Sequence, residues 1–518
     1  MNIGSEMQEI SSNNKRIAKN TLLLYFRMLV TMAVSLYTSR VVLNILGVED
    51  FGIYNVVGGI VAMFGFINGS MTSATQRYLT FELGQNNRTQ LTKVFSTSLS
   101  IHAIISFLII VLAETVGLWF LWNKMQIPAD RMNAAFWVFQ CSVAASVIMI
   151  MSVPYNAAII AHERMSAFAY ISIIEVSLKL LIVCFLRYFH TDKLILYAAL
   201  IVIVQLVIRL CYSWYCNRHF KETKYRWIWD KTLFCEMTGF AGWNLFGNLA
   251  AITFTQGLNL LLNMFFGPVV NAARGIAVQA QTAIGQFSSN FQTALNPQIT
   301  KSYATGDMEY MHGLIFRSAK FSFFLLLLLS LPVLIETKAL LTLWLKIVPD
   351  HTVVFLRIML CTTWVYAVSN PLITAASATG KIKLYQSVVG GLLLLILPIS
   401  YLCLRLGLPA YSVFIVHLVI EITAQFARLL MLKRMIKLSL REYFSKVVWC
   451  IFKVTAIALA TPLAVAYWQP GEGIWNLLTI CLICAISTSM SVYWFGLTSG
   501  EKIYISSRIS SIVSKFRK

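Results

Sequence analysis

The sequence predicts an all-α integral membrane protein of about fourteen transmembrane helices. Apolar residues make up 58% of its 518 residues, charged residues make up only 12%, and the mean hydropathy is +0.71. A soluble domain lies nearer half apolar and a quarter charged. Apolar runs of about 20 residues, the length that crosses ~30 Å of hydrocarbon, recur along the whole chain.

Each apolar run is interpreted as one membrane span, with polar or basic residues between successive spans. The expected spans are 20–43, 53–76, 95–122, 134–158, 167–188, 194–216, 236–265, 268–294, 315–345, 352–376, 384–405, 410–432, 448–468 and 474–497.

An internal repeat relates spans one to six to spans seven to twelve. The phrase Glu-Thr-x-x-Leu-x-x-Leu-Trp begins at Glu114 and again at Glu336, each time near the end of a long apolar run. Ser152-x-Pro154 likewise corresponds to Ser369-x-Pro371. Because six crossings return the chain to the same side, the two halves are expected to be parallel repeats related by an axis along the membrane normal.

This repeat sets the expected organisation of the chain. The expected regions are a cytoplasmic N-terminal segment (1–19), an N-lobe (20–216), a cytoplasmic amphipathic linker (217–235), a C-lobe (236–435), a helical pair (436–497) and a basic cytoplasmic tail (498–518).

The net charge of +21 reflects topology and not nucleic-acid binding. Most Lys and Arg residues fall in one alternating set of connections, such as 218–231 and 433–446, which is the positive-inside pattern. These connections and both termini are therefore expected to be cytoplasmic. No cleavable signal peptide is expected, because the first apolar run leads directly into the protein. The connections are too short for a separate catalytic domain, so an enzyme is not expected.

The ten cysteines show no metal-binding or disulfide spacing. Cys481 and Cys484 lie inside the last apolar run, where small buried thiols explain them. No metal site and no bound cofactor are expected.

Ionisable side chains inside spans are functional candidates, because a charge in hydrocarbon is costly without a partner. Arg27 lies about 10 Å inside the first span and Arg274 about 9 Å inside the eighth, at ~1.5 Å per residue. Neither has an acid within four residues on its own helix. Another helix, a bound substrate or snorkelling to the interface would have to stabilise each of them. Arg40, near an outer helix end, is a weaker candidate.

Acids inside spans are fewer. Glu175 and Lys179 are one turn apart, so they either neutralise each other or form a proton or cation relay. Glu421 lies near mid-membrane at the repeat position of Arg209, so a contact across the halves is one alternative. All three of Glu175, Lys179 and Glu421 are candidates for coupling to an H⁺ or Na⁺ gradient.

Spans two and eight are unusually polar, and their hydroxyls and amides would either line a wet cavity or make interhelical hydrogen bonds. The expected cavity residues are Asn68, Gln76, Gln279, Gln286 and Asn290. With more cations than acids in the spans, such a cavity suits an anionic head group, because guanidinium forms paired hydrogen bonds with phosphate.

The stretches 20–27, 37–44 and 46–55 carry a specific resemblance. With the Leu46-Gly47-x-x-x-Phe51-Gly52 turn, they resemble bacterial oligosaccharide flippases of the Wzx type, in the multidrug/oligosaccharidyl-lipid/polysaccharide (MOP) exporter superfamily. The resemblance implies a V-shaped, MATE-like bundle of two six-helix lobes plus a C-terminal helical pair. It also implies an undecaprenyl-diphosphate-linked oligosaccharide as cargo, passed across the bacterial inner membrane by alternating access.

In the related lipid II flippases, arginines on the first and eighth helices bind the diphosphate, which implies that role for Arg27 and Arg274, with Arg40 as a third candidate. Those flippases also carry an arginine in the second helix, and residues 53–76 contain none. A polysaccharide polymerase and chain-length machinery are the further partners that such a role implies. The extra pair at 448–497 would either accommodate the lipid tail or support the lobe.

Two other functions compete with the flippase hypothesis. A cation-coupled multidrug exporter of the same superfamily would need acids in an apolar cavity, and these are scarce here. A membrane glycan polymerase or glycosyltransferase would carry a sizeable outer loop with catalytic residues. Glu49-Asp50 is the only acidic pair expected outside, and it lies in the family turn.

Overall fold

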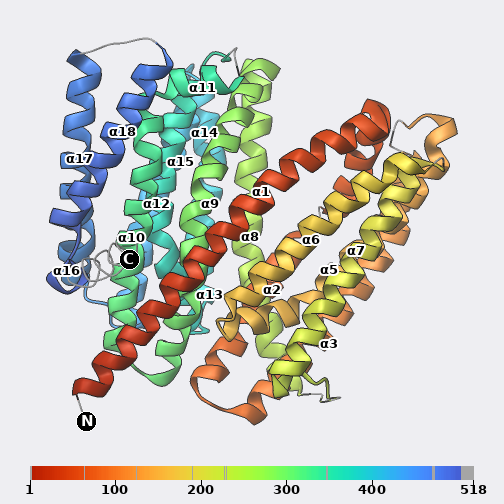
Figure 1. The fold of residues 1–518 in the computed structure, drawn as a ribbon, viewed down its shortest axis with the longest axis horizontal. Coiled ribbons are helices and arrows are strands. Elements are labelled where there is room, and N and C mark those ends of the chain that lie inside the picture. Colours follow the sequence, from red (N-terminus) through yellow and green to blue (C-terminus); the bar gives the residue numbers. More distant parts are fainter. Residues whose placement is uncertain are drawn as a thin grey trace, which may run out of the picture. The chain divides into compact units, whose positions relative to one another are not determined.

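All regular secondary structure among the described residues is helical (Figure 1). The computed structural model describes residues 3–62, 65–123, 125, 127–189, 191–226, 228, 230–345, 348–468 and 473–502. Twelve helices of this part of the chain are long and apolar enough to cross a membrane.

These twelve helices coincide with all the expected spans except the second and the eighth. The second span is helical at the end of α1 (Ile3–Ala62) and in α2 (Gly65–Gly84), and the eighth is helical as α9 (Pro268–Thr305). Helices α2 and α9 are more polar than the other long helices. The predicted fold class is therefore confirmed, and the two polar helices account for the difference between fourteen and twelve.

The first compact unit comprises residues 1–249, 294–307 and 380–383. Its helices are α1 (Ile3–Ala62), α2, α3 (Arg88–Leu112), α4 (Leu118–Asn123), α5 (Met132–Ala161), α6 (Met165–Phe185), α7 (Lys193–His219) and the first half of α8 (Lys231–Phe266). Helices α5 and α7 pack along each other, and α1 packs against α6. Buried apolar residues such as Val94, Val138 and Phe139 form a common core.

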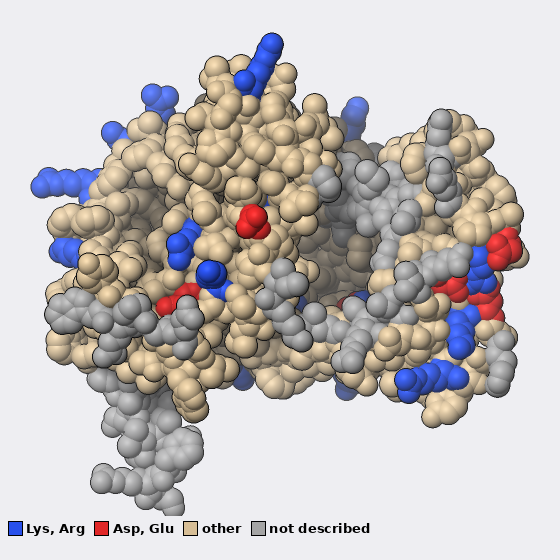
Figure 2. All heavy atoms as spheres, turned by 90° about the horizontal axis from the view of Figure 1, so that it is seen from above, with Lys and Arg blue, Asp and Glu red and all other residues tan. Residues whose placement is uncertain are grey.

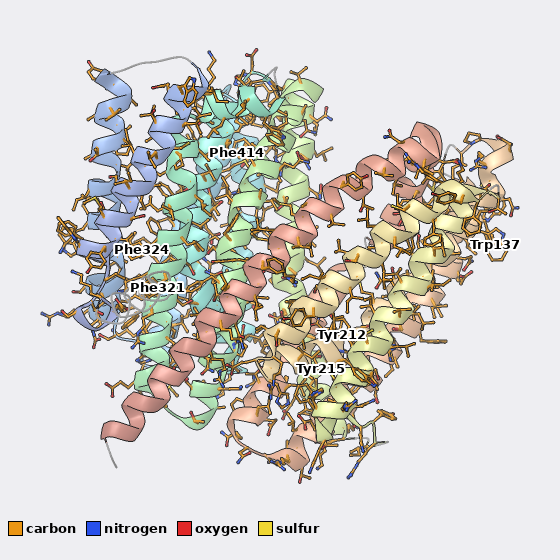
Figure 3. All side chains as sticks on the ribbon, in the orientation of Figure 1. Trp137, Tyr212, Tyr215, Phe321, Phe324 and Phe414 are labelled. Atoms are coloured by element: carbon orange, nitrogen blue, oxygen red, sulfur yellow. The ribbon has the colours of Figure 1, made fainter. Side chains whose placement is uncertain are left out.

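The second compact unit comprises residues 250–293, 308–379 and 384–518. Its helices are the second half of α8, most of α9, α10 (Met308–Ile335), α11 (Thr337–Leu345), α12 (Thr352–Ala378), α13 (Lys383–Leu394), α14 (Ile396–Arg405), α15 (Ser412–Met435), α16 (Leu440–Tyr443), α17 (Trp449–Trp468) and α18 (Ile474–Ser491). Phe355 and Phe414, with ring centroids 4.6 Å apart, lie in its core. Phe414 is labelled in Figure 3.

Helices α17 and α18 form the expected C-terminal pair and pack on α10. Phe323 and Phe324 of α10 share a buried apolar cluster with Val454 of α17 and Ile480 of α18. Phe321 and Phe324 are labelled on α10 in Figure 3. Burial of these apolar side chains against α10 stabilises the packing of the pair on the second unit.

A single backbone break in α1 produces the turn expected after the first span. Gly47 has φ 79° and ψ 171°, a conformation outside the helical region that glycine tolerates at little cost. The Leu46-Gly47 turn is therefore a kink between two helical segments of α1 and not an extended loop.

The repeated Glu-Thr phrase marks a helix irregularity in both halves. Around Glu114 the helix widens into a π-helical turn (Ala113–Gly117), and at Glu336 the helix breaks between α10 and α11. Gln140 donates to the Glu114 carboxylate at 3.2 Å. At the corresponding position of the second repeat, Arg357 donates to the Thr337 hydroxyl at 3.0 Å and to the Ile335 carbonyl at 3.2 Å. Arg357 thus hydrogen-bonds to the backbone and to a hydroxyl at the helix break.

An ion cluster ties three elements of the first unit together near the Gly47 break. Arg131, just before α5, donates through Nε and Nη2 to the Asp50 carboxylate at 2.9 and 2.5 Å. Its Nη1 donates to Asp192 at 2.8 Å. Asp192 also caps α7 by accepting from the Leu194 N–H at 3.0 Å. One guanidinium therefore fixes the α1 turn relative to the starts of α5 and α7.

We expect Arg131→Gln to lower the unfolding free energy by about 1–2 kcal/mol, because the variant loses charge-assisted hydrogen bonds and leaves two carboxylates close together. Thermal unfolding of the detergent-solubilised protein measures this loss. Arg187→Ala removes an exposed cation from the end of α6 and is the matched control. Equal melting temperatures for the two variants would show that the cluster contributes nothing to stability.

Candidate functional site

Arg274 is the strongest candidate for binding an anion in the second unit. It lies on α9, is only 6% exposed, and is held by two neutral oxygens of α8. Nη1 donates to Asn259 Oδ1, and Nη2 donates to the Thr255 carbonyl at 2.9 Å. No carboxylate in the described part of the chain lies within ion-pair distance of this guanidinium. Its charge is therefore solvated by dipoles without being neutralised.

Glu421, a candidate for ion coupling, is already paired in the same unit. Its carboxylate accepts from Arg428 Nη1 at 2.7 Å, and the two side chains are 5% and 3% exposed. Arg428 also donates to Ser369 Oγ at 3.2 Å, and Ser369 donates to Gln425 at 2.6 Å. Glu421 therefore has an ion-pair partner within its own half, and the Arg428 side chain is buried in protein.

His417 lies one turn before Glu421 on α15, with its ring 4.8 Å from that of Phe254. It is within electrostatic reach of both Arg274 and Glu421. The second unit thus contains a line of polar groups from α8 through α9 to α15, in which Arg274 is the cation without an acidic partner.

Arg27, the matching candidate of the first unit, is half-buried on α1. Its guanidinium lies over the Phe168 ring of α6, 4.6 Å from the ring centroid. A cation over an aromatic face is held by electrostatic attraction without losing its charge. Glu175 and Lys179 on α6 form the expected pair at 2.6 Å, and Gln205 of α7 donates to the same carboxylate at 3.4 Å.

An arginine that sequence reasoning missed lies in the second helix. The expected span ended at 76, but α2 continues to Gly84 and therefore contains Arg77. Its guanidinium lies 4.5 Å from the Tyr78 ring centroid, 4.8 Å from that of Phe81 and 5.8 Å from that of Phe240. The conclusion that the second helix lacks an arginine is thus wrong, because a polar helix gives no apolar boundary from which to place its end.

The Arg209 side chain is hydrogen-bonded to the backbone of α5. Its Nη1 donates to the Met151 carbonyl, beside the Ser152-x-Pro154 motif. Proline cannot donate to the carbonyl four residues earlier and loosens the helix there. In the second repeat, Pro371 releases the Ala367 carbonyl, and Gln292 of α9 donates to it at 2.8 Å. Pro154 releases the neighbouring Ile150 carbonyl, so both Ser-x-Pro motifs lie at or beside a carbonyl that accepts from a polar side chain of another helix.

The polar residues of α9 fall into two groups. Gln281 and Gln292 make interhelical hydrogen bonds, the former to Thr363 at 2.7 Å and the latter to Ser322 at 3.0 Å. A second group, beyond the exposed Val269 of the first turn, is exposed at helical spacing and contains no large apolar side chain. Its members are Ala272, Gly275, Gln279, Thr282, Ala283, Gln286 and Ser289. A lipid-facing helix such as α3 instead exposes Phe107 and Leu108. The exposed face of α9 therefore suits water and not hydrocarbon.

The other predicted cavity residues are not on this exposed face of α9. Asn290 is buried and donates to the Gln286 carbonyl of its own helix at 2.9 Å. Gln76 is half-buried. The side chains of Asn68 and Arg40 lie outside the described part of the structure. Gln279 and Gln286 are thus the two predicted residues that the structure places on the exposed polar face.

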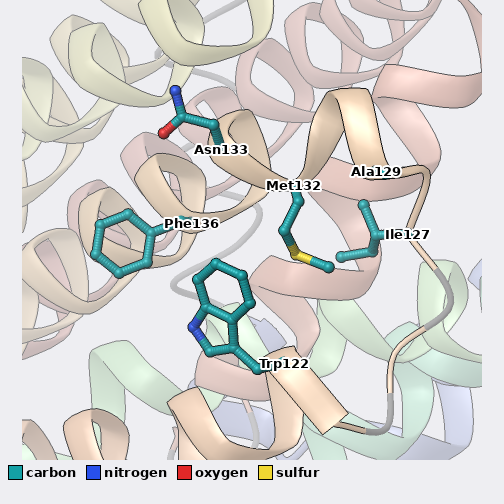
Figure 4. Close-up of a pocket in the computed structure, with 6 residues that line it drawn as sticks. All are labelled: Trp122, Ile127, Ala129, Met132, Asn133 and Phe136. Carbon is teal, nitrogen blue, oxygen red and sulfur yellow. The ribbon is translucent and has the colours of Figure 1, made fainter.

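One surface depression of the first unit is lined mainly by apolar side chains. A depression of about 520 Å³ between α4 and α5 is lined by Trp122, Ile127, Ala129, Met132, Asn133 and Phe136, without any charged group (Figure 4). Most of the molecular face in Figure 2 is uncharged. Within the described residues no three His, Cys, Asp or Glu side chains could hold a metal ion, and the ten cysteines are free.

Solved structures show which fold this arrangement belongs to. A MATE in the bent conformation superimposes with a TM-score of 0.72 at 12% identity, over 86% of this chain and 97% of that chain. An outward-facing multidrug resistance MATE family transporter of the MOP superfamily gives 0.70 at 13% identity, over 82% and 96%. A MOP superfamily transporter from Pyrococcus furiosus gives 0.68 at 13%, over 82% and 96%. No protein-family model and no curated protein matches the sequence. The chain therefore has the MATE transporter fold.

The buried pair on α15 generates a prediction. Arg428→Met should lower the unfolding free energy by about 3–5 kcal/mol, because it leaves the Glu421 carboxylate buried without a counter-ion. The double variant Glu421→Met/Arg428→Met should recover most of this loss, because neither charge then has to be desolvated. Thermal melting of the three proteins measures both effects. A double variant no more stable than Arg428→Met would contradict the ion-pair interpretation.

Proposed function

We propose that this protein is a flippase that moves an undecaprenyl-diphosphate-linked oligosaccharide repeat unit from the cytoplasmic to the outer leaflet of the bacterial inner membrane by alternating access. A sugar diphosphate cannot enter hydrocarbon by itself, because desolvating its charge costs far more than thermal energy. Such a cargo needs a hydrated path with fixed positive charge.

The main support for this proposal is that a positive charge, that of Arg274, is not neutralised by a carboxylate in the described structure, whereas the candidate acids are paired. Arg274 is bonded to neutral oxygens, whereas Glu421 and Glu175, the acids nominated for coupling, are paired with Arg428 and Lys179. A guanidinium whose charge is solvated but not cancelled can attract phosphate oxygens. The P. furiosus neighbour is described as having a binding pocket of reverse polarity that suggests a different function, so the fold accommodates more than one polarity.

The exposed polar face of α9 supports the same proposal. Gln279, Thr282, Gln286 and Ser289 offer hydroxyls and amides, which hydrogen-bond sugars well, on the same helix as Arg274. Alternating exposure of this face to the two sides of the membrane would move the head group while the lipid tail stays in the bilayer.

Cation-coupled multidrug export is the second candidate, because one structural neighbour is a multidrug resistance transporter. A cationic drug would favour unpaired acids, and a phosphorylated lipid favours unpaired cations. Expression in a drug-susceptible host distinguishes the two: drug resistance without any effect on surface glycan supports export of drugs.

Arg27→Ala and Arg274→Ala should each abolish surface-glycan display while protein levels stay normal, because each removes a cation from the proposed diphosphate path. Lipid-linked repeat units should accumulate on the cytoplasmic face in both variants. Arg405→Ala, which removes an exposed arginine at the end of α14, is the matched control and should display glycan normally. Normal display in both test variants would remove the proposed site.

A further inference from the structure

One buried carboxylate of the first unit forms ion pairs with two cations. Glu163 lies in the turn between α5 and α6, and its side chain is 1% exposed. Oε1 accepts from Lys301 Nζ at 2.6 Å. Oε2 accepts from Gln298 Nε2 at 2.6 Å and from Arg16 Nε at 2.9 Å. We call Glu163, Arg16, Gln298 and Lys301 the Glu163 cluster.

The cluster joins three parts of the first unit. Arg16 lies near the start of α1, and Gln298 and Lys301 lie in the last two turns of α9, which belong to this unit. Asn20 of α1 also donates to the Glu163 carbonyl at 3.2 Å. These elements meet at the side of the membrane expected to be cytoplasmic, where a substrate made in the cytoplasm would arrive.

The turn itself does not require a carboxylate. Glu163 has φ 58°, a left-handed conformation that is unfavourable for a non-glycine residue. At the matching position of the second repeat, one residue before Lys381 as Glu163 precedes Arg164, the chain has Gly380 with φ 75°. The first repeat thus uses a strained glutamate where the second uses glycine, so the carboxylate itself has a role.

The charge of the cluster indicates that role. Two cations converge on one carboxylate, so the cluster carries a net positive charge. A phosphate or diphosphate group, with more negative charge and more oxygens, would match Arg16 and Lys301 better than a single carboxylate does. The Gln298 amide is a neutral donor suited to a further phosphate oxygen.

We propose that Arg16, Gln298 and Lys301 form an entry site for the phosphate groups of the substrate, and that Glu163 occupies this site as an internal counter-ion which the substrate displaces. This inference rests on the proposed function and specifies its first step. Displacement of Glu163 frees the end of α9 from the α5–α6 turn. Because Arg16 is about half exposed, with 47% of its side chain accessible, an incoming anion can reach it before the carboxylate leaves.

Whether a Glu163 variant binds anions more tightly or more weakly than the unaltered protein tests this proposal. With full-length protein in nanodiscs, Glu163→Gln should bind pyrophosphate and geranylgeranyl diphosphate several-fold more tightly than the unaltered protein, because the competing carboxylate is gone. Lys301→Gln should bind both several-fold more weakly. Glu309→Gln, which removes an exposed acid at the start of α10, is the matched control and should change neither affinity.

Hydrogen exchange gives a second readout on the same samples. Adding diphosphate should raise deuterium uptake of residues 294–307 in the unaltered protein, and Glu163→Gln should show raised uptake without any probe. If Glu163→Gln does not fold, Glu163→Gly, which copies the second repeat, serves instead. Tighter binding of geranylgeranyl diphosphate alone would assign the site to lipid-linked phosphate, and equal gains for both probes would assign it to phosphate in general.

A purely structural role for the cluster predicts the opposite result. In that case Glu163→Gln and Glu163→Gly would lose thermal stability and bind diphosphate no better than the unaltered protein, which would overturn the entry site. That outcome leaves the proposed function standing, since glycan export in the Arg27 and Arg274 variants decides it separately.

Discussion

A charged side chain inside a membrane protein must find oxygen or aromatic partners, because hydrocarbon offers none, and this constraint organises the polar structure of this protein. Different ions satisfy it in different ways. Arg131 and Arg428 bind carboxylates, Arg209 and Arg357 donate to backbone carbonyls, and the contacts of Arg27 and Arg77 include aromatic rings. The Glu421 carboxylate cancels the charge of Arg428, whereas the neutral oxygens around Arg274 solvate its charge without cancelling it.

The two repeats show how related sequence positions take on different chemistry. Gln140 and Arg357 occupy matching positions and both bind the Glu-Thr phrase, one through its carboxylate and the other through its hydroxyl and a nearby carbonyl. Glu163 and Gly380 also occupy matching positions with the same left-handed backbone. Backbone geometry has thus been retained between the halves while side-chain charge has diverged, which is expected if the fold is shared and the ligand contacts differ.

Polar helices have two uses in this fold. Gln292 of α9 donates to the carbonyl that Pro371 releases in α12, and Gln279 and Gln286 of α9 are exposed. Interhelical hydrogen bonds and an exposed polar face therefore coexist on α9, at positions separated by helical periodicity. The hydrogen-bonding alternative considered from sequence is confirmed for Gln281 and Gln292, and a water-filled cavity beside α9 stays a prediction.

The sequence by itself determined the membrane class, the order of the helices and the internal repeat, because apolar length and repeated phrases are local properties of the chain. It also predicted the Glu175–Lys179 pair, whose members are one turn apart. Only the tertiary structure decided that Glu421 binds Arg428, that Arg77 lies inside α2 under aromatic rings, and that Lys301 reaches Glu163. Lys301 and Glu163 are 138 residues apart, and Phe240 of α8 approaches Arg77 of α2. Even the Glu421–Arg428 pair, two turns apart on α15, depends on how neighbouring helices bury it. Packing, and not spacing along the sequence, therefore determines which charges are cancelled and which remain available to a ligand.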